Sequence, residues 1–253
     1  TLVNKLIGEE RLLTSPVAGT TRDSIDSIIQ KGDKKYILID TAGIRRKAKL
    51  TFSVERYSVF RAIRALERSD IVLLMIDAED GPTHQDARIS NLVVEKGKGC
   101  ILLINKWDLV PKEIAETPNI ESILKSGLKA LNFSPVLIIS ALTGRKLNNI
   151  FDLIDYVYAN YSQRISTKKL NTFLNKLTEI KPPPLYNGKE VKFFYISQPY
   201  TKQPTFVIFT NYKKALKENY KKFLENKFRE EFNFEGTPIK FIFRERTKTQ
   251  SKN

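Results

Sequence analysis

The 253-residue chain has almost none of the side chains that form disulfides and soft-metal centres. It contains one cysteine, Cys100, and one histidine, His84. A lone cysteine excludes an internal disulfide and fits a reducing compartment, and two such residues are too few for a zinc site. We expect Cys100, which opens an apolar segment, to be an inert buried hydrophobe. We expect His84, in a loop containing glycine and proline, to be exposed rather than catalytic.

Long hydrophobic runs are also missing. No segment approaches the ~18 consecutive apolar residues that a membrane-spanning helix requires. We therefore expect no membrane partner, and a monomer in the cytoplasm or, in a eukaryote, in an organelle stroma. The hydrophobic fraction of 41% is enough to fill a core, and the length allows one large or two ordinary domains.

Negative charge is scarce relative to positive charge, and the imbalance is uneven. Residues 168–253 hold 19 lysines and arginines against 8 acidic residues, a net charge of +11, whereas residues 1–167 carry only +4. This asymmetry predicts two domains with different partners. The excess of positive charge favours an anionic partner such as a nucleic acid.

The first part of the sequence alternates between two hydrophobic patterns. Short, nearly continuous apolar runs, typical of parallel strands buried on both faces, occur at 36–39, 71–76, 101–104 and 136–139. Helical patterns occur at 54–67, 86–95, 120–131 and 148–161. The alternation predicts an α/β, doubly wound parallel sheet with ligands at the carboxyl ends of its strands. We expect this domain to span residues 1–164.

A second, smaller α+β domain is expected at 165–246. A helical pattern that ends at Ile180, before three prolines, is followed by strand patterns at 191–197 and 205–210, a helix at 219–232 and a strand at 239–243. This α-β-β-α-β order predicts one three-stranded sheet covered by two helices. Residues 247–253 are expected to be a flexible basic tail.

The most informative motif directly follows the apolar run at 101–104 and reads Asn105-Lys106-Trp107-Asp108. It fits N-K-x-D, the guanine-reading loop of GTPases. Guanine presents its N1–H and its exocyclic amine side by side, so that the Asp108 carboxylate can accept both, and a site of this kind can reject the wrong ligand by roughly 10⁴–10⁵. Asn105 can tie this loop to a phosphate-binding loop and face the base. The aliphatic stem of Lys106 can lie across the base plane.

A second motif contributes to the base site. The run at 136–139 is followed by Ser140, Ala141 and Leu142. In this segment the backbone N–H of Ala141 can donate to guanine O6. Both base-reading motifs therefore follow predicted strands, as a site at the carboxyl edge of the sheet requires.

Two upstream motifs have the chemistry of a phosphate and magnesium site. After the run at 36–39 come the residues of a D-x-x-G motif, Asp40, Thr41, Ala42 and Gly43. In that motif the Asp holds a Mg²⁺-bound water and the Gly amide meets a γ-phosphate. Further upstream, Thr21 offers a hydroxyl to Mg²⁺ and the γ-phosphate, with Thr20 as the alternative, although a cap or turn role for both threonines stays open. The four motifs together predict binding of GTP or GDP with Mg²⁺.

At these positions the chain resembles the Der (EngA) family, bacterial proteins with two GTPase domains. The matching stretches of the first part are 18–23, 40–47, 67–70 and 105–108, and those of the second part are 182–185, 204–209 and 234–239. The resemblance covers nearly the whole chain, and the second part makes it specific. It implies a P-loop GTPase domain followed by a KH-like domain. It also implies GTP hydrolysis coupled to maturation of the large ribosomal subunit, with that subunit and its rRNA as partners.

The chain departs from the family pattern in two places. It starts in what resembles the helix after a phosphate-binding loop G-x-x-x-x-G-K-S, so we expect that loop, its strand and a first GTPase domain to precede Thr1. The KH-like part has no G-x-x-G, the loop with which ordinary KH domains clamp a nucleic-acid backbone. We therefore expect this part to contact RNA through other surfaces.

No catalytic side chain can be assigned from the sequence. The residue after the D-x-x-G motif is Ile44, whereas many GTPases place a water-orienting glutamine there. Ile44 can neither orient nor deprotonate water. Resemblance to GTPases that share this hydrophobic residue and the switch at 19–23 implies that K⁺ can supply a fixed positive charge beside the phosphates.

Two basic clusters are candidates for RNA contact, although each can equally be a solvated surface. They comprise Arg45, Arg46 and Lys47 in the second switch segment, and Lys213, Lys214 and Lys217 in the KH-like part. Aromatic residues that can stack on bases, but that are expected to belong to the core, are Phe193, Phe194, Tyr195, Phe206 and Phe209.

Two other functions compete with an active GTPase. One is a non-enzymatic RNA-binding module with a vestigial nucleotide site, which the presence of all four motifs disfavours. The other is a GTPase that assists tRNA modification. That function would require a cofactor domain and often a terminal catalytic cysteine, and the sequence shows neither.

Overall fold

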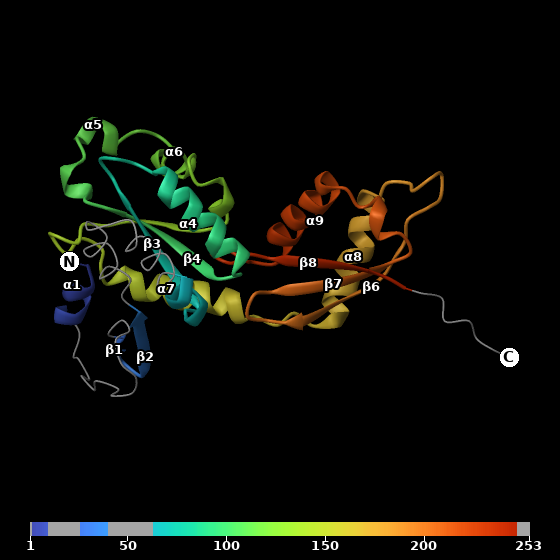
Figure 1. Cartoon of the computed structure of the whole chain (residues 1–253), viewed down its shortest axis with the longest axis horizontal. Coiled ribbons are helices and arrows are strands. Elements are labelled where there is room, and N and C mark those ends of the chain that lie inside the picture. Colours follow the sequence, from blue (N-terminus) through green and yellow to red (C-terminus); the bar gives the residue numbers. More distant parts are fainter. Residues whose placement is uncertain (1, 10–25, 40–62, 247–253) are drawn as a thin grey trace, which may run out of the picture. The chain divides into compact units, whose positions relative to one another are not determined.

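A computed structural model describes residues 2–9, 26–39 and 63–246. The chain divides into two compact units, Thr1–Ile154 and Asp155–Asn253, called here the first and second unit (Figure 1). The domain boundary expected at 164–165 stays a prediction. The expected features that lie outside the described residues are Thr20, Thr21, Asp40, Thr41, Ala42, Gly43, Ile44, Arg45, Arg46, Lys47, most of the helix at 54–67, and the tail 247–253.

The centre of the first unit is a parallel three-stranded sheet in the order β3–β4–β5. β3 spans Ile71–Asp77, β4 spans Gly99–Asn105 and β5 spans Val136–Ile138. The side chains from Cys100 to Ile104 are at most 1% exposed, which explains why the central strand is apolar at every position rather than at alternate ones. The three parallel strands predicted at 71–76, 101–104 and 136–139 are confirmed.

The crossover between β3 and β4 is the helix α4 (His84–Glu95). Its first turn is closed by a reciprocal pair of hydrogen bonds. The Asp86 amide donates to Thr83 Oγ1 (3.3 Å), and the Thr83 amide donates to the Asp86 carboxylate (2.9 Å). These bonds satisfy two backbone donors that the helix itself leaves unpaired, so α4 begins two residues before the predicted 86–95.

The single helix predicted at 120–131 is wrong. The segment contains α6 (Ile120–Lys125), a turn at Gly127, and the 3₁₀ turn η2 (Lys129–Leu131). Glycine is a poor helix former, and a Cβ at Gly127 would lie 3.1 Å from Pro82 Cβ. The turn also places Leu128 and Leu131 in the core, where they are 1% and 0% exposed. Two further short elements between β4 and β5 are η1 (Trp107–Leu109) and α5 (Lys112–Ala115).

The buried parallel strand predicted at 36–39 is also wrong. β2 (Lys34–Ile39) pairs antiparallel with β1 (Asp26–Lys31), a strand that was not predicted. The two strands are joined by a tight turn in which Gly32 has a φ of 58°, a conformation that glycine adopts without strain. One face of this hairpin packs on α7 (Asn149–Ser162), where the Tyr36 and Phe151 rings lie 4.9 Å apart. On the other face, Ile37 is 62% exposed.

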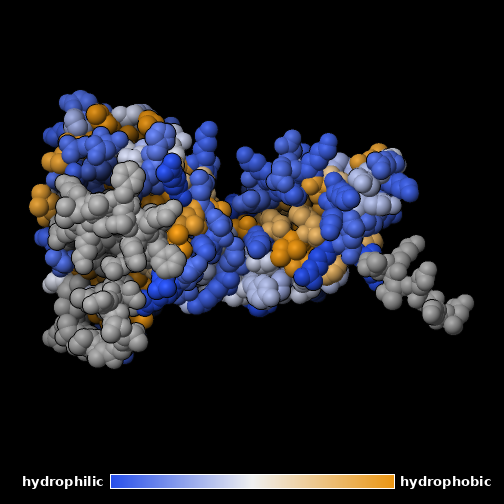
Figure 2. All heavy atoms as spheres, viewed as in Figure 1, coloured by the Kyte–Doolittle hydropathy of each residue, from blue (hydrophilic) through white to orange (hydrophobic). Residues whose placement is uncertain are grey.

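The second unit has the predicted α-β-β-α-β order. Its elements are α8 (Thr167–Ile180), β6 (Phe193–Tyr200), β7 (Thr205–Thr210), the 3₁₀ turn η3 (Lys213–Ala215), α9 (Glu218–Glu231) and β8 (Lys240–Glu245). β7 is central, antiparallel to β6 and parallel to β8. Both helices contribute to one core with Leu174, Phe206, Ile208, Leu224 and Phe228. Hydrophilic residues cover the outer side of α9 (Figure 2).

The last two turns of α7 belong to the second unit and dock on the loop before β8. Tyr156 and Asn160 donate hydrogen bonds of 3.0 Å to the carboxylate and backbone carbonyl of Glu235. The next residue, Gly236, has a φ of 76°, and a Cβ there would lie 2.4 Å from Val157 Cγ2. Backbone conformation and space therefore both require glycine at this position.

Replacing this glycine should destabilise the second unit. In Gly236→Ala, the left-handed backbone costs about 1–2 kcal/mol, and the overlap with Val157 costs about 1–3 kcal/mol more. Gly188→Ala is the matched control, because Gly188 has a φ of 74° and no atom lies within 4 Å of the position that its Cβ would take. Urea denaturation followed by circular dichroism should show the larger loss for Gly236→Ala. Equal losses would mean that Val157 yields without cost.

Candidate nucleotide-binding site

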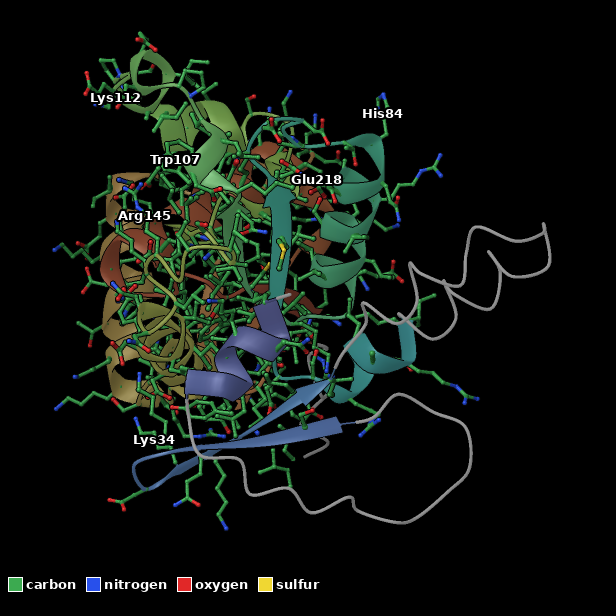
Figure 3. All side chains as sticks on the ribbon, turned by 90° about the vertical axis from the view of Figure 1, so that its left-hand side faces the viewer. Lys34, His84, Trp107, Lys112, Arg145 and Glu218 are labelled. Carbon is green, nitrogen blue, oxygen red and sulfur yellow. The ribbon has the colours of Figure 1, made fainter. Side chains whose placement is uncertain are left out.

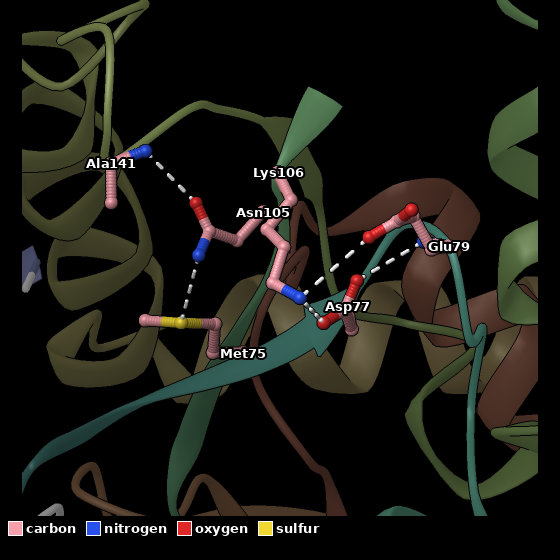
Figure 4. A network of polar contacts seen from close by, with 6 residues as sticks. All are labelled: Met75, Asp77, Glu79, Asn105, Lys106 and Ala141. Carbon is pink, nitrogen blue, oxygen red and sulfur yellow. Dashed lines mark hydrogen bonds and ion pairs between the residues drawn. The ribbon is translucent and has the colours of Figure 1, made fainter. Parts of the chain in front are cut away.

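The parallel register brings the ends of the three strands of the first unit to one edge of the sheet. Asp77, the last residue of β3, pairs with Asn105, the last residue of β4, and Ile104 pairs with Ile138 of β5. The polar segments that follow β4 and β5 therefore start side by side. Figure 4 shows the contacts that join them.

Asn105 connects the loops that follow β4 and β5. Its side-chain oxygen accepts a hydrogen bond of 2.9 Å from the Ala141 amide, and its side-chain nitrogen lies 3.5 Å from Met75 Sδ. The sequence indicated a tie to a phosphate-binding loop, whereas the partner here is the second base-reading motif. The Ala141 amide is thus already engaged, so donation to guanine O6 requires that this bond be shared or exchanged.

Lys106 is held at both its backbone and its side chain. Its φ of 64° and ψ of 32° are left-handed, which costs a residue other than glycine about 1–2 kcal/mol. Its ammonium group lies 2.5 Å from Asp77 Oδ2 and 3.7 Å from Glu79 Oε2. The Glu79 amide also donates to Asp77 Oδ1 at 3.1 Å. The two carboxylates hold the aliphatic stem of Lys106 along the sheet edge.

This ion pair shifts both titrations. The hydrogen bond from Lys106 holds the pKa of Asp77 below its ordinary value of 3.8, and burial opposes that shift. The hydrogen bond to Asp77, followed by the attraction of its charge, raises the pKa of Lys106 above 10.5. Both residues therefore stay charged throughout the neutral range.

Trp107 and Asp108 face different environments. The Trp107 side chain is 7% exposed, and its amide donates to the Ile139 carbonyl at 3.2 Å. The ring belongs to the hydrophobic core of the first unit and anchors the loop there. Asp108 is exposed, and within the described part of the chain no hydrogen bond or ion pair engages its carboxylate. A fixed loop thus presents a carboxylate that can accept from a ligand.

The loop after β5 is a tight turn. Buried Ser140 accepts at Oγ from the Thr143 amide (3.1 Å) and at its carbonyl from the Gly144 amide (3.0 Å). Gly144, with a φ of 86°, lets the chain reverse so that Arg145 bridges back to Ser140. Leu142 projects from the turn and is 71% exposed. The base-site residues Asn105, Lys106, Asp108, Ser140, Ala141 and Leu142 are thus gathered at one edge, and their role stays a prediction.

Asp77 and Glu79 were missed by the sequence analysis. The available signal was an acidic residue directly after the apolar run at 71–76, at the sheet edge where the motif at 105–108 was expected. Strand pairing was needed to recognise that Asp77 lies beside Asn105 rather than beside a residue of another strand.

Cys100 is buried and His84 is exposed, as expected, although His84 begins α4 rather than lying in a loop. Cys100 is fully buried, which raises the pKa of its thiol to about 12, so it stays protonated and unreactive. His84 is exposed and points away from the unit (Figure 3). Nowhere in residues 2–9, 26–39 and 63–246 do three His, Cys, Asp or Glu side chains gather as they would around a metal ion. No helix in those ranges is long and apolar enough to span a membrane.

Comparison with known proteins gives two family matches. Residues 1–106 match a family described as "50S ribosome-binding GTPase", and residues 164–244 match "KH-domain-like of EngA bacterial GTPase enzymes, C-terminal". The predicted fold class, an α/β P-loop GTPase fold followed by a KH-like domain, is confirmed by these matches.

Full-length proteins that are similar to this chain belong to the same family as both matches. The GTPase Der of Caldanaerobacter subterraneus is 48% identical over 238 residues, which cover 94% of this chain and 54% of that protein. The GTPase Der of Moorella thermoacetica is 46% identical over 243 residues, which cover 96% and 56%. The chain thus spans about half the length of these relatives. Among solved structures, a variant of Aquifex aeolicus Era bound to GDP and AlF4⁻ aligns with a TM-score of 0.47 and 21% identity, covering 96% of this chain and 87% of that one.

The ion pair between Asp77 and Lys106 should be measurable in the pKa of the Asp77 carboxyl group. Because the folded pKa of Asp77 is lowered, the pair contributes stability above pH 3.8 and loses it as the pH falls through that lower pKa. Lys106→Met should raise the pKa of Asp77 towards 3.8, as read from its carboxyl ¹³C resonance. Lys112→Met, at an exposed lysine of α5, should leave the titration unchanged. A wild-type midpoint at or above 3.8 would contradict the pairing.

Proposed function

Since the chain belongs to the Der (EngA) family, we propose that its first unit reads the guanine base of GTP in an enzyme that hydrolyses GTP to GDP and phosphate. The observation that supports this most strongly is that no described residue engages the carboxylate of Asp108, which is presented by a loop fixed on both sides. Asn105 fixes the loop through Ala141, and Lys106 fixes it through Asp77.

Three side chains of these loops have separate roles in binding the base. The Asp108 carboxylate accepts from the N1–H and the exocyclic amine of guanine, whereas adenine offers no such pair of donors. The stem of Lys106 covers one face of the base, since its ammonium is already held by Asp77. Leu142, which is 71% exposed, offers apolar surface at the rim. Discrimination then follows from leaving Asp108 unpaired against the wrong base.

The phosphates and Mg²⁺ are assigned to residues outside the described part of the chain. We propose Thr21, with Thr20 as the alternative, as the Mg²⁺ hydroxyl, and Asp40 as the residue that holds a Mg²⁺-bound water. Hydroxyl and carboxylate oxygens are the ligands that Mg²⁺ prefers, so this set fits the ion. When bound, Mg²⁺ neutralises charge on the phosphate oxygens. Thr41, Ala42 and Gly43 complete the segment that meets the γ-phosphate.

The partner we propose is the large ribosomal subunit and its rRNA. Support comes from the net charge of +11 in residues 168–253 and from the matched family described as "50S ribosome-binding GTPase". The exposed Lys213, Lys214 and Lys217, around η3 and the start of α9, are candidate phosphate contacts. Arg45, Arg46 and Lys47 are candidates on the first unit. GTP hydrolysis in the first unit would then control how the protein binds RNA.

Asp108→Asn in the complete protein should move nucleotide preference from GTP towards xanthosine triphosphate. The amide of asparagine donates to the xanthine carbonyl that replaces the guanine amine. Competition binding with the two nucleotides measures this shift. The variant should prefer xanthosine triphosphate, whereas a site of this kind can prefer its own ligand by roughly 10⁴.

The matched control is Glu113→Gln, which neutralises an exposed acid of α5 and should keep the wild-type preference. Undiminished GTP preference in Asp108→Asn would exclude Asp108 as the base reader. A wild-type protein that binds no guanine nucleotide would favour the alternative of an RNA-binding module with a vestigial site.

We further propose that K⁺ assists hydrolysis. Ile44 offers no polar group to the attacking water, so a monovalent cation supplies the missing positive charge. GTP hydrolysis by the complete protein should be faster in KCl than in NaCl at equal ionic strength, as measured by phosphate release. Equal rates in the two salts would exclude K⁺ as that charge.

A further inference from the structure

In the second unit, the helices α8 and α9 pack on one face of the sheet. Phe206 and Ile208 of β7 point into the core beneath α8 and α9. Because neighbouring residues of a strand point to opposite faces, Val207 and Phe209 lie on the other face, where Val207 is buried at 6% exposure and Phe209 is half-buried. Strand pairing adds Tyr195 of β6 and Arg244 of β8 to that face, called here the open face.

One row across the open face combines two stacked rings with a guanidinium group. Tyr195 and Arg244 are the two cross-strand partners of Phe209. The Tyr195 and Phe209 rings are nearly parallel, at 9°, with centroids 4.4 Å apart. Tyr195 remains 42% exposed. The row therefore offers an ordered aromatic surface with a positive charge at its end.

A bulge places a third ring next to this row. Phe193 pairs with Thr210 and Tyr195 pairs with Phe209, so Phe194 is an extra residue between two consecutive pairs. Bulges of this kind redirect a side chain, and Phe194 is 44% exposed. The Arg246 guanidinium lies 5.7 Å from the centre of the Phe194 ring, within the range of a cation–π contact.

The expectation that the strand aromatics belong to the core is thus wrong for Phe194, Tyr195 and Phe209, which lie on the open face. It is confirmed for Phe206, and Phe193 packs against the core. The sequence does not show where a bulge interrupts the alternation of a strand, so it could not predict which aromatic side chains face outward. Two large rings at the surface gain little from folding, and their exposed surface is available to a ligand.

The charges beside the rings favour a nucleic acid. β6 and β7 contain no acidic residue, and the one in β8, Glu245, accepts a hydrogen bond from the Lys213 amide. Lys240, Arg244 and Arg246 supply positive charge along β8 and just after it, and in the described residues no acidic side chain pairs with Arg244. Rings that stack on bases beside cations that meet phosphates are the two components of a single-strand site.

We propose that the open face binds single-stranded RNA, with bases stacked on Phe194 and Tyr195 and phosphates paired with Arg244 and Arg246. The ligand is single-stranded because the bases of a duplex are stacked on each other and cannot reach a protein ring. This site replaces the backbone clamp of a G-x-x-G loop, which the second unit lacks. The inference rests on the proposed association with rRNA and assigns it a surface.

The experiment, made in the complete protein, compares the wild type with Phe194→Leu, Tyr195→Leu and Arg244→Gln. Fluorescence anisotropy with a labelled 12-nucleotide single-stranded RNA, and with its duplex, gives affinities over a series of salt concentrations. Each leucine keeps an apolar side chain but removes the ring, and should weaken single-strand binding roughly five- to 150-fold. Duplex binding and the salt dependence should not change. Arg244→Gln should reduce the slope of log affinity against log salt by about 0.7.

Two controls accompany these variants. Tyr158→Leu removes an exposed ring that also has a cation beside it, Lys202 at 5.1 Å, but lies on α7 rather than on the open face. It should keep wild-type affinity. Reversing Lys213, Lys214 and Lys217 to Glu should weaken the single strand and the duplex together, because these residues act through charge alone. Unchanged circular dichroism and guanine-nucleotide affinity verify that each variant is folded.

The possible failures are distinguishable. If the wild type binds the single strand and the leucine variants bind it equally well, the open face is excluded while RNA association stands. The open face is also excluded as an RNA site if the leucine variants keep RNA binding and lose only binding to ribosomal subunits. That result would make the face a protein-binding surface. If ring removal weakens the duplex as much as the single strand, stacking is excluded. If the wild type binds neither RNA nor ribosomal subunits, the proposed partner falls as well.

Discussion

The first unit depends on the burial of one strand. β4 lies between two parallel neighbours, and the side chains from Cys100 to Ile104 are excluded from water. A strand in this position can be apolar throughout and can place polar residues only where it ends. The parallel direction of all three strands then brings their ends to the same edge. The position of the candidate site follows from where hydrophobic residues can be buried.

Polar contacts convert that edge into a fixed surface. The hydrogen bond between Asn105 and Ala141 joins the loops after two strands, and the ion pair between Lys106 and Asp77 adds the end of the third. Exposed ion pairs contribute little to stability, so the value of this one lies in orientation. It keeps the Lys106 stem in place before a ligand arrives, which reduces the entropy that binding must remove.

Sequence patterns predicted the elements with a strong period and failed where strand pairing or a contact between distant residues decides. The continuous apolar runs at 71–76, 101–104 and 136–139 became strands, and the middle one is buried from Gly99 to Ile104. The run at 36–39 looked the same but belongs to a hairpin, since the turn at Gly32 pairs it with β1 instead. The helix at 120–131 breaks near Gly127, a poor helix former, and Pro82, far away in sequence, packs against this turn. Phe194 is exposed because of a bulge, which depends on the pairing of β6 with β7.

The central claim is that the loops after β4 and β5 form one surface that reads guanine. The most direct measurement is an NMR titration of the ¹⁵N-labelled complete protein with GDP and, separately, with ADP. The account predicts that the side-chain amide of Asn105 and the backbone amides of Asp108 and Ala141 shift together with GDP and stay in place with ADP. Equal shifts with both nucleotides, or shifts with GDP that leave these three residues unaffected, would contradict it.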